Sequence, residues 1–198
     1  MTVGITGGIG SGKSAVTREL AYRGYAFYDC DTQAKRIIAE TSIVQFQITK
    51  LFGKRAFSYN RYNAPYVAKR AFEEPELLKQ LNEIVHPHVL KDLEDLTRYR
   101  RERGAQDPLF VESAILFESG LARLCDQIIV LDAPDEVRIK RVIDRDYHGN
   151  DTPKNRELIQ ARINAQRREI DSQLSVTHFL NDGNKPINEL VNQILISL

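Results

Sequence analysis

Short apolar runs alternate with longer amphipathic segments along most of the chain. The apolar runs have the length of strands and cover residues 3–6, 25–28, 109–113, 127–131 and 177–180. Buried strands that alternate with helical segments are typical of α/β proteins with a parallel sheet. The pattern therefore predicts an α/β fold with a five-stranded parallel sheet.

Residues 32–104 interrupt this alternation, because they contain no strand-like run. Their apolar positions recur at spacings of three and four, which predicts helices. We expect a helical insertion between the second and third strands, with a polar, tyrosine-rich connection at residues 57–65. A second charged segment, at about 138–172, carries many arginines and few aliphatic residues.

The composition indicates which kinds of partner the protein binds and where in the cell it is found. The 198 residues suit one domain with an insertion. Lys and Arg total 28 while Asp and Glu total 27, so no overall charge attracts nucleic acid or an anionic membrane. No apolar stretch approaches ~20 residues, and Cys30 and Cys125 are too few for a disulfide framework. We expect a reduced, soluble, cytoplasmic protein that binds neither nucleic acid nor membranes, with its oligomeric state left open.

The segment between the first strand and the helix after it carries the strongest motif. Residues 7–14 read G-G-I-G-S-G-K-S, which fits G-x-x-x-x-G-K-[ST] at every fixed position. Such a loop binds phosphate by pointing main-chain N–H groups and a helix N-terminus at its oxygens. Lys13 can place its ammonium against the β- and γ-phosphates, and Ser14 can supply a hydroxyl to Mg²⁺.

Two aspartates, Asp29 and Asp31, follow the second predicted strand. A phosphoryl transferase needs a group that accepts a hydrogen bond from the attacking hydroxyl and aims it in line. Asp31 can do this, while Asp29 can cap the next helix or hold a metal-bound water. The alternative is that Asp31 itself caps that helix, and the spacing leaves both interpretations open.

Glu112 lies at the end of the third predicted strand, where phosphate-loop proteins often place an acid that holds Mg²⁺ directly or through water. Pairing with a neighbouring arginine is the alternative. Several of the arginines between residues 138 and 168 are expected on solvated faces, as most charged helices are. Arg141 and Arg145 lie one helical turn apart, so both can face the phosphates.

The order of these motifs resembles the dephospho-coenzyme A kinase family of phosphate-loop kinases. The matching segments follow the family's order over almost the whole chain: residues 6–14, 29–31, 81–87, 114–121, Arg141 with Arg145-Asp146, 165–166 and 180–183. The first segment is shared with many nucleotide-binding proteins. The His-Pro segment at 86–87 and the Leu-Phe-Glu-Ser-Gly segment at 116–120 are more particular to the family.

The resemblance implies an adenylate-kinase-like P-loop NTPase core, a helical coenzyme A-binding insertion and a lid. The implied core covers residues 1–31, 105–140 and 170–198, the insertion 32–104 and the lid 141–169. The implied reaction transfers the γ-phosphate of ATP to the ribose 3′-hydroxyl of dephospho-CoA, which is the last step of coenzyme A biosynthesis. The substrates are then ATP and dephospho-CoA, with Mg²⁺ as cofactor.

The resemblance also implies roles for individual residues. Lys13, Asp31 and Arg141 are the expected catalytic residues, His86 the acceptor contact, and Ser14 with Glu112 the metal site. The expected ATP-binding residues are Gly8, Gly10, Ser11, Gly12, Lys13, Ser14, Ala15, Arg145, Asn181 and Gly183.

Two rival functions use the same loop. Another P-loop small-molecule or nucleoside kinase would share the loop and the arginines but bind a different acceptor in the insertion. A GTP-dependent switch would need an N-K-x-D segment after a strand. The nearest candidate, residues 184–187, reads N-K-P-I and lacks the acid, so the sequence disfavours a switch.

Overall fold

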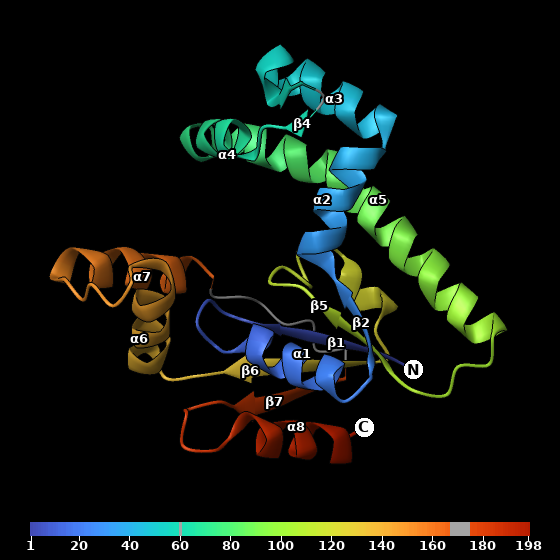
Figure 1. The fold of residues 1–198 in the computed structure, drawn as a ribbon, viewed down its shortest axis with the longest axis vertical. Coiled ribbons are helices and arrows are strands. Elements are labelled where there is room, and N and C mark those ends of the chain that lie inside the picture. The colour runs from blue at the N-terminus through green and yellow to red at the C-terminus, as the bar shows by residue number, and fades with distance from the viewer. Residues whose placement is uncertain (60, 167–174) are drawn as a thin grey trace. The chain divides into compact units, whose positions relative to one another are not determined.

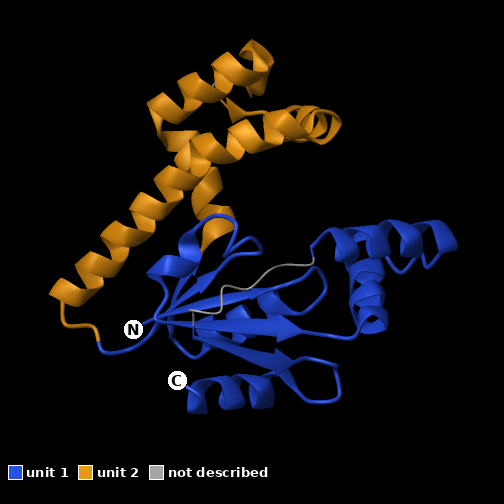
Figure 2. Ribbon diagram, turned by 180° about the vertical axis from the view of Figure 1, so that it is seen from behind, with its two compact units in different colours: residues 1–28, 106–198 blue, residues 29–105 orange. Residues whose placement is uncertain are grey.

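The computed structural model describes residues 1–59, 61–166 and 175–198, and the chain forms two compact units (Figure 1, Figure 2). Unit 1 comprises Met1–Tyr28 together with Gln106–Leu198, and unit 2 comprises Asp29–Ala105. The roles predicted for the insertion and for a lid at residues 141–169 stay predictions. In the described part of the chain, no helix combines the length and the apolar character that a membrane span requires.

Unit 1 is built on a five-stranded sheet in the order β2-β5-β1-β6-β7. The strands are β1 (Thr2–Gly7), β2 (Ala26–Asp29), β5 (Leu109–Glu112), β6 (Gln127–Asp132) and β7 (Val176–Leu180). β1 pairs in parallel with β5 and β6, and β6 pairs in parallel with β7. The prediction of an α/β fold with a five-stranded parallel sheet is confirmed.

The main core lies between this sheet and two helices, α1 (Lys13–Tyr22) and α8 (Ile187–Ile196) (Figure 1). Every residue of β1 is buried, and its apolar side chains, Val3 and Ile5, lie on the same face of the strand. The cluster on the α1 and α8 side comprises Val3, Ile5, Val16, Leu20, Phe110, Ile129, Leu131, Leu190, Val191 and Ile194. This packing fixes the end of β1 relative to the start of α1.

The segment between β5 and β6, which includes the 3₁₀ helix η2 (Leu121–Leu124), packs on β1 at Gly4. A Cβ atom at Gly4 would lie 2.7 Å from Leu116 Cδ2 and 2.9 Å from Cys125 Sγ. Only glycine therefore allows this close approach without a shift of the neighbouring side chains.

Helices α6 (Asp135–Asp146) and α7 (Pro153–Ala165) form a second small core within unit 1. Their apolar positions follow the spacing of three and four that a helix face requires. The cluster comprises Ile139, Val142, Ile143, Ile159 and Ile163, and Ile9 packs against it. The side chain of Thr152 caps α7 by accepting a hydrogen bond from the Asn155 N–H at 3.2 Å.

The described residues of unit 2 are helical apart from one short pair of antiparallel strands. Its helices are α2 (Cys30–Glu40), α3 (Ser42–Phe52), the 3₁₀ helix η1 (Lys54–Ala56), α4 (Ala64–Glu73) and α5 (Pro75–Glu102). The predicted connection at residues 57–65 contains two antiparallel strands, β3 (Phe57–Ser58) and β4 (Arg61–Tyr62). The expectation that residues 32–104 hold no strand was therefore wrong here, because two-residue strands are too short to show an alternating pattern.

Candidate active site

The phosphate-binding loop predicted at residues 7–14 connects the end of β1 to the start of α1. Gly12 is the N-cap of α1 and has φ 97°, in the left-handed region that favours glycine. A Cβ atom at Gly12 would collide with the Asn181 side-chain amide. The motif glycine is thus required both by the backbone conformation and by the neighbouring side chain.

Main-chain N–H groups of this loop are available to a ligand. No hydrogen bond among the described residues uses the N–H groups of Gly10, Gly12 or Ser14, whereas the Ala15 N–H donates to Gly12 O at 3.0 Å. The positive end of the α1 dipole lies at the same place. Unpaired N–H groups at a helix N-terminus form an anion site, and phosphate oxygens are its natural acceptors.

Lys13 lies across the loop. Its ammonium donates to Gly7 O at 2.9 Å and to Gly8 O at 3.3 Å. These contacts hold the positive charge at the loop. A cation in this position can neutralise the charge of bound β- and γ-phosphates.

Ser11, also predicted to bind ATP, is buried within the loop. Its N–H donates to Gly8 O at 3.2 Å, and its side-chain Oγ has no hydrogen-bond partner among the described residues. A buried hydroxyl without a partner is uncommon and leaves a donor available at the site.

Arg141 reaches the loop from α6. Its guanidinium donates to Gly10 O at 3.2 Å and to Asn181 O at 3.1 Å, and its second NH₂ group donates to Asn181 Oδ1 at 3.0 Å. The Asn181 amide in turn donates to Ser11 O at 2.8 Å. Burial lowers the pKa of the Arg141 guanidinium, and the nearby Asp182 carboxylate partly opposes this effect. A partly desolvated cation therefore lies beside the loop, as its predicted role requires.

The other predicted ATP contacts on this side are Arg145 and Gly183. Gly183 has φ 87°, and a Cβ atom there would lie 3.5 Å from the Arg141 guanidinium. Arg145 instead forms an exposed ion pair with Asp146 at 2.6 Å, which raises the pKa of its guanidinium. Arg141 thus contacts the loop, whereas Arg145 pairs with Asp146, the next residue in the sequence.

The predicted metal ligands are Ser14, which is exposed at the start of α1, and Glu112, which ends β5. Glu112 accepts a hydrogen bond from the buried Thr17 hydroxyl at 3.2 Å. Thr17 lies one helical turn after Ser14, so the carboxylate lies against the same helix that carries the serine. A hydroxyl and a carboxylate suit Mg²⁺, which is commonly held by one or two protein oxygens together with substrate phosphates. These residues therefore fit that ion.

Asp29 and Asp31 are distinguished by the way α2 begins. Asp29 is the N-cap: its carboxylate accepts from the N–H groups of Asp31 at 3.0 Å and Thr32 at 3.2 Å. The alternative that Asp31 caps the helix was therefore wrong, because α2 begins at Cys30 and not at residue 32. Asp31 is exposed in the first turn, which leaves its predicted role as hydroxyl orienter open.

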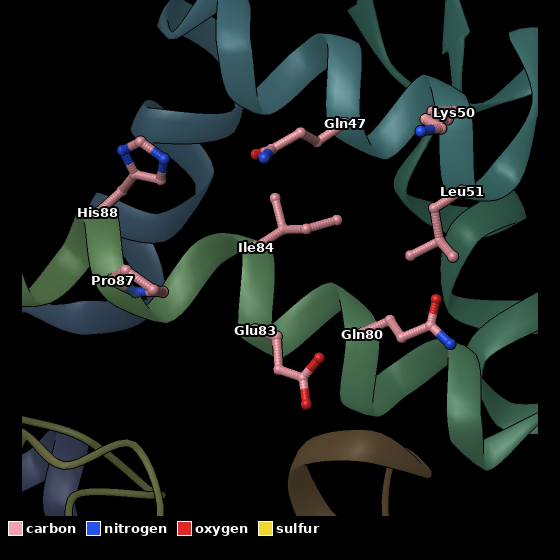
Figure 3. Close-up of a pocket in the computed structure, with 8 residues that line it drawn as sticks. All are labelled: Gln47, Lys50, Leu51, Gln80, Glu83, Ile84, Pro87 and His88. Carbon is pink, nitrogen blue, oxygen red and sulfur yellow. The ribbon is translucent and has the colours of Figure 1, made fainter.

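Unit 2 contains a pocket of about 630 Å³ between α3 and α5 (Figure 3). It is lined by Gln47, Lys50, Leu51, Gln80, Glu83, Ile84, Pro87 and His88. The α5 residues are spaced as one helical face, and this face includes His88. His86, the predicted acceptor contact, does not line the pocket, and burial lowers the pKa of its imidazole.

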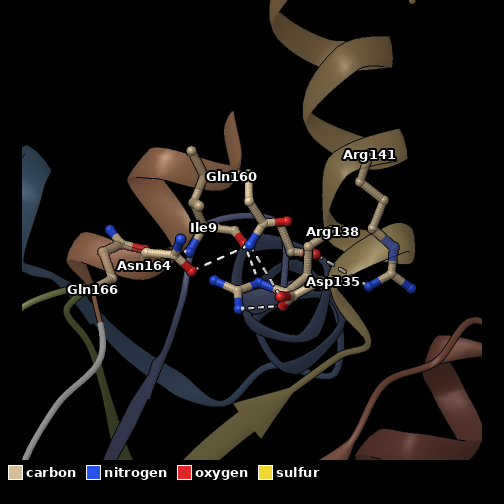
Figure 4. A network of polar contacts seen from close by, with 8 residues as sticks. Ile9, Asp135, Arg138, Arg141, Gln160, Asn164 and Gln166 are labelled. Atoms are coloured by element: carbon tan, nitrogen blue, oxygen red, sulfur yellow. Dashed lines mark hydrogen bonds and ion pairs between the residues drawn. The ribbon is translucent and has the colours of Figure 1, made fainter. Parts of the chain in front are cut away.

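Sequence reasoning missed two contacts of the loop. Arg138 donates to Ile9 O at 2.8 Å, and Gln166 accepts from the Ile9 N–H at 2.7 Å (Figure 4). Arg138 was placed among charged residues typical of a solvated face, and no local pattern distinguishes it. Both contacts span more than 120 residues of sequence, so only the tertiary structure shows them.

A parallel five-stranded sheet with this loop after its central strand β1 defines a P-loop nucleotide-binding protein. The sequence profile of the dephospho-CoA kinase family matches residues 1–186. A relative from Porphyromonas gingivalis named dephospho-CoA kinase is 40% identical over 162 residues, which cover 82% of this chain and 78% of the relative.

Solved structures share the fold of this chain. The crystal structure of TT1252 from Thermus thermophilus is 30% identical, with a TM-score of 0.73 over 100% of this chain and 95% of that one. Dephospho-CoA kinase from Campylobacter jejuni shares the fold, with 22% identity and a TM-score of 0.65 over 99% and 96% of the two chains. The chain belongs to the dephospho-CoA kinase family and is thus an ATP-dependent kinase.

Proposed function

We propose that this chain transfers the γ-phosphoryl group of ATP to the ribose 3′-hydroxyl of dephospho-CoA, giving CoA and ADP. Family membership supports the choice of substrates. The observation that carries the nucleotide half is the loop, where the N–H groups of Gly10, Gly12 and Ser14 are available beside two cations, Lys13 and Arg141.

The proposed chemistry is an in-line displacement at the γ-phosphorus. The 3′-oxygen forms the new bond to phosphorus, the bond to the β,γ-bridging oxygen breaks, and ADP leaves. Lys13 and Arg141 stabilise the charge that spreads over the phosphoryl oxygens. Asp31 orients the attacking hydroxyl and accepts its proton. Mg²⁺, held by Ser14 and Glu112, would supply further neutralisation of the phosphate charge.

The pocket of unit 2 supports a small-molecule site in the insertion. Its volume of about 630 Å³ lies within the range of ligand sites. Gln47 and Gln80 offer side-chain amides that suit the amide groups of the acceptor's pantetheine arm, and Lys50 offers a cation for its phosphates. We place the acceptor's arm in this pocket, with His88 rather than His86 in its wall. The use of ATP and CoA precursors is consistent with a cytoplasmic location, which is part of the proposal.

A panel of hydroxyl acceptors tests this function directly. Purified protein is incubated with Mg²⁺-ATP and, in separate reactions, with dephospho-CoA, a nucleoside or shikimate, and ADP release is measured. We expect ADP equimolar with the acceptor consumed only for dephospho-CoA. Equal or faster turnover of a nucleoside would replace the proposal with the rival small-molecule or nucleoside kinase.

A further inference from the structure

The main chain of Ile9, at the tip of the phosphate loop, is held on both sides by side chains from the α6 and α7 region. The Ile9 N–H donates to Gln166 Oε1 at 2.7 Å, and the Ile9 carbonyl accepts from Arg138 Nε at 2.8 Å (Figure 4). Gln166 directly follows α7, and Arg138 lies in the first turn of α6. The main-chain N–H and C=O of Ile9 are thus both hydrogen-bonded to side chains that lie far away in sequence.

The side chain of Ile9 and the two neighbouring glycines also contact α6 and α7 or lie directly against them. The Ile9 side chain packs against the small core of α6 and α7. A Cβ atom at Gly8 would collide with the Arg138 guanidinium, and one at Gly10 would lie 2.6 Å from Arg138 O. The loop therefore rests directly on α6, with Gly10 against the backbone of Arg138 and Gly8 against its side chain.

Arg138 is itself held in place. Its side chain is 14% exposed, and it pairs with Asp135 at 3.3 Å. The amide of Gln160 from α7 also donates to Asp135, at 3.2 Å, so the two helices share this carboxylate (Figure 4). An arginine that is fixed by an ion pair and by packing loses little further freedom when it holds the loop.

A glycine-rich loop samples many conformations unless its surroundings restrict it. Restricting a site before its ligand arrives strengthens binding, because less conformational freedom is lost in the complex. Ile9 lies between Gly8 and Gly10, so fixing its peptide groups restricts the most flexible part of the motif. The available N–H groups of Gly10 and Gly12 begin directly after this point.

We propose that Gln166 and Arg138 are positioning residues that hold Ile9, and thereby shape the phosphate loop for the nucleotide before it binds. This inference rests on the proposed function only in taking the nucleotide phosphates as the loop's ligand. Gln166 acts as a neutral acceptor. A carboxylate at residue 166 would keep the hydrogen bond to Ile9 but add a negative charge beside the phosphates.

Hydrogen exchange of the Ile9 amide in nucleotide-free protein tests the clamp by itself. A hydrogen-bonded amide exchanges only when its bond opens. We expect Gln166→Met to speed exchange of the Ile9 amide by tenfold or more, whereas Gln166→Glu keeps it slow. Gln193→Met, at an exposed glutamine of α8, is the matched control and should leave it slow. An Ile9 amide that exchanges equally fast in wild type and Gln166→Met would overturn the proposal.

Calorimetric titration with ADP then tests the consequence for binding. The loss of one hydrogen bond predicts roughly three- to tenfold weaker ADP binding in Gln166→Met and in Arg138→Met. Gln166→Glu should also weaken ADP binding through its charge, and this effect should shrink at high salt. Lys140→Met removes an exposed cation two residues from Arg138 and should bind ADP as the wild type does.

The kinetic readout separates positioning from general damage. Gln166→Met should raise KM for ATP while KM for dephospho-CoA stays within twofold, whereas a globally damaged fold would change both. Unchanged ADP affinity in both Gln166→Met and Arg138→Met would overturn the positioning role. A wild-type protein that fails to bind ADP would instead contradict the proposed function, and the exchange measurement would still decide whether Ile9 is clamped.

Discussion

The phosphate loop of unit 1 and the pocket of unit 2 are built from different parts of the chain. The loop presents main-chain groups: the N–H groups of Gly10, Gly12 and Ser14 are available, and carbonyls of the loop hold Lys13 and Arg141. The pocket presents side chains that project from single faces of α3 and α5.

This difference explains why the loop is easier to predict from the sequence than the pocket. A site made of main-chain groups requires glycines at fixed places, since the backbone conformation and close contacts exclude other residues there. A site made of side chains on helix faces requires only the spacing of three and four that any packed helix shows. A short motif therefore predicts the loop but not the pocket.

Asp31→Asn should have the largest effect. We expect it to lower kcat and to leave nucleotide binding unchanged. The amide keeps the size of the side chain and removes the base, so we expect kcat to fall ~100-fold or more. Titration with ADP should show unchanged affinity. Asp29→Asn is the control, because an asparagine oxygen can still cap α2. If Asp31→Asn keeps wild-type turnover, Asp31 has no role in proton transfer.

Gly12→Ala should damage the nucleotide site alone. The left-handed backbone at φ 97° and the collision with the Asn181 amide both oppose a Cβ atom, so we expect about 30- to 100-fold weaker ADP binding. Gly24→Ala is a matched control in the same unit, since Gly24 has φ 84° but no atom within 4 Å of the added Cβ. Equal ADP affinities for the two variants would show that the loop does not bind the nucleotide.

Lys50→Glu should affect the pocket alone. Reversal of this charge opposes an anionic acceptor, so we expect KM for dephospho-CoA to rise about tenfold while KM for ATP is unchanged. Lys54→Glu makes the same change at an exposed residue of η1 that does not line the pocket. Steady-state kinetics with either substrate varied would measure both values. The same KM in the two variants would place the acceptor elsewhere.

His86 should give the smallest effect, on stability rather than on activity. Burial lowers the pKa of its imidazole in the folded chain, so the unfolded chain binds a proton more readily. Neutral His86 therefore makes its full contribution to the free energy of unfolding above the pKa of histidine in the unfolded chain, which is about 6.5. This contribution is lost as the pH falls below that value. Urea unfolding between pH 7 and pH 5 should therefore show a shallower decline for His86→Gln. Parallel declines would mean that His86 titrates alike in both states.

Much of the core was predictable, because its signals are local. The five strands appear as apolar runs, and the loop of residues 7–14 appears as a motif after the first of them. The sequence left the cap of α2 open between Asp29 and Asp31, since a shift of the helix start by two residues decides which carboxylate faces the free N–H groups. The contacts of Arg138 and Gln166 with Ile9 could not be predicted, because residues remote in sequence meet there.

The central claim is that main-chain N–H groups of the loop grip the nucleotide's phosphates. Amide chemical shifts of Gly10, Gly12 and Ser14, followed by NMR during titration with Mg²⁺-ADP, test it most directly. New hydrogen bonds to phosphate should move all three amide protons downfield and saturate together with the calorimetric binding curve. Amides that stay at their nucleotide-free positions in saturated protein would contradict the account.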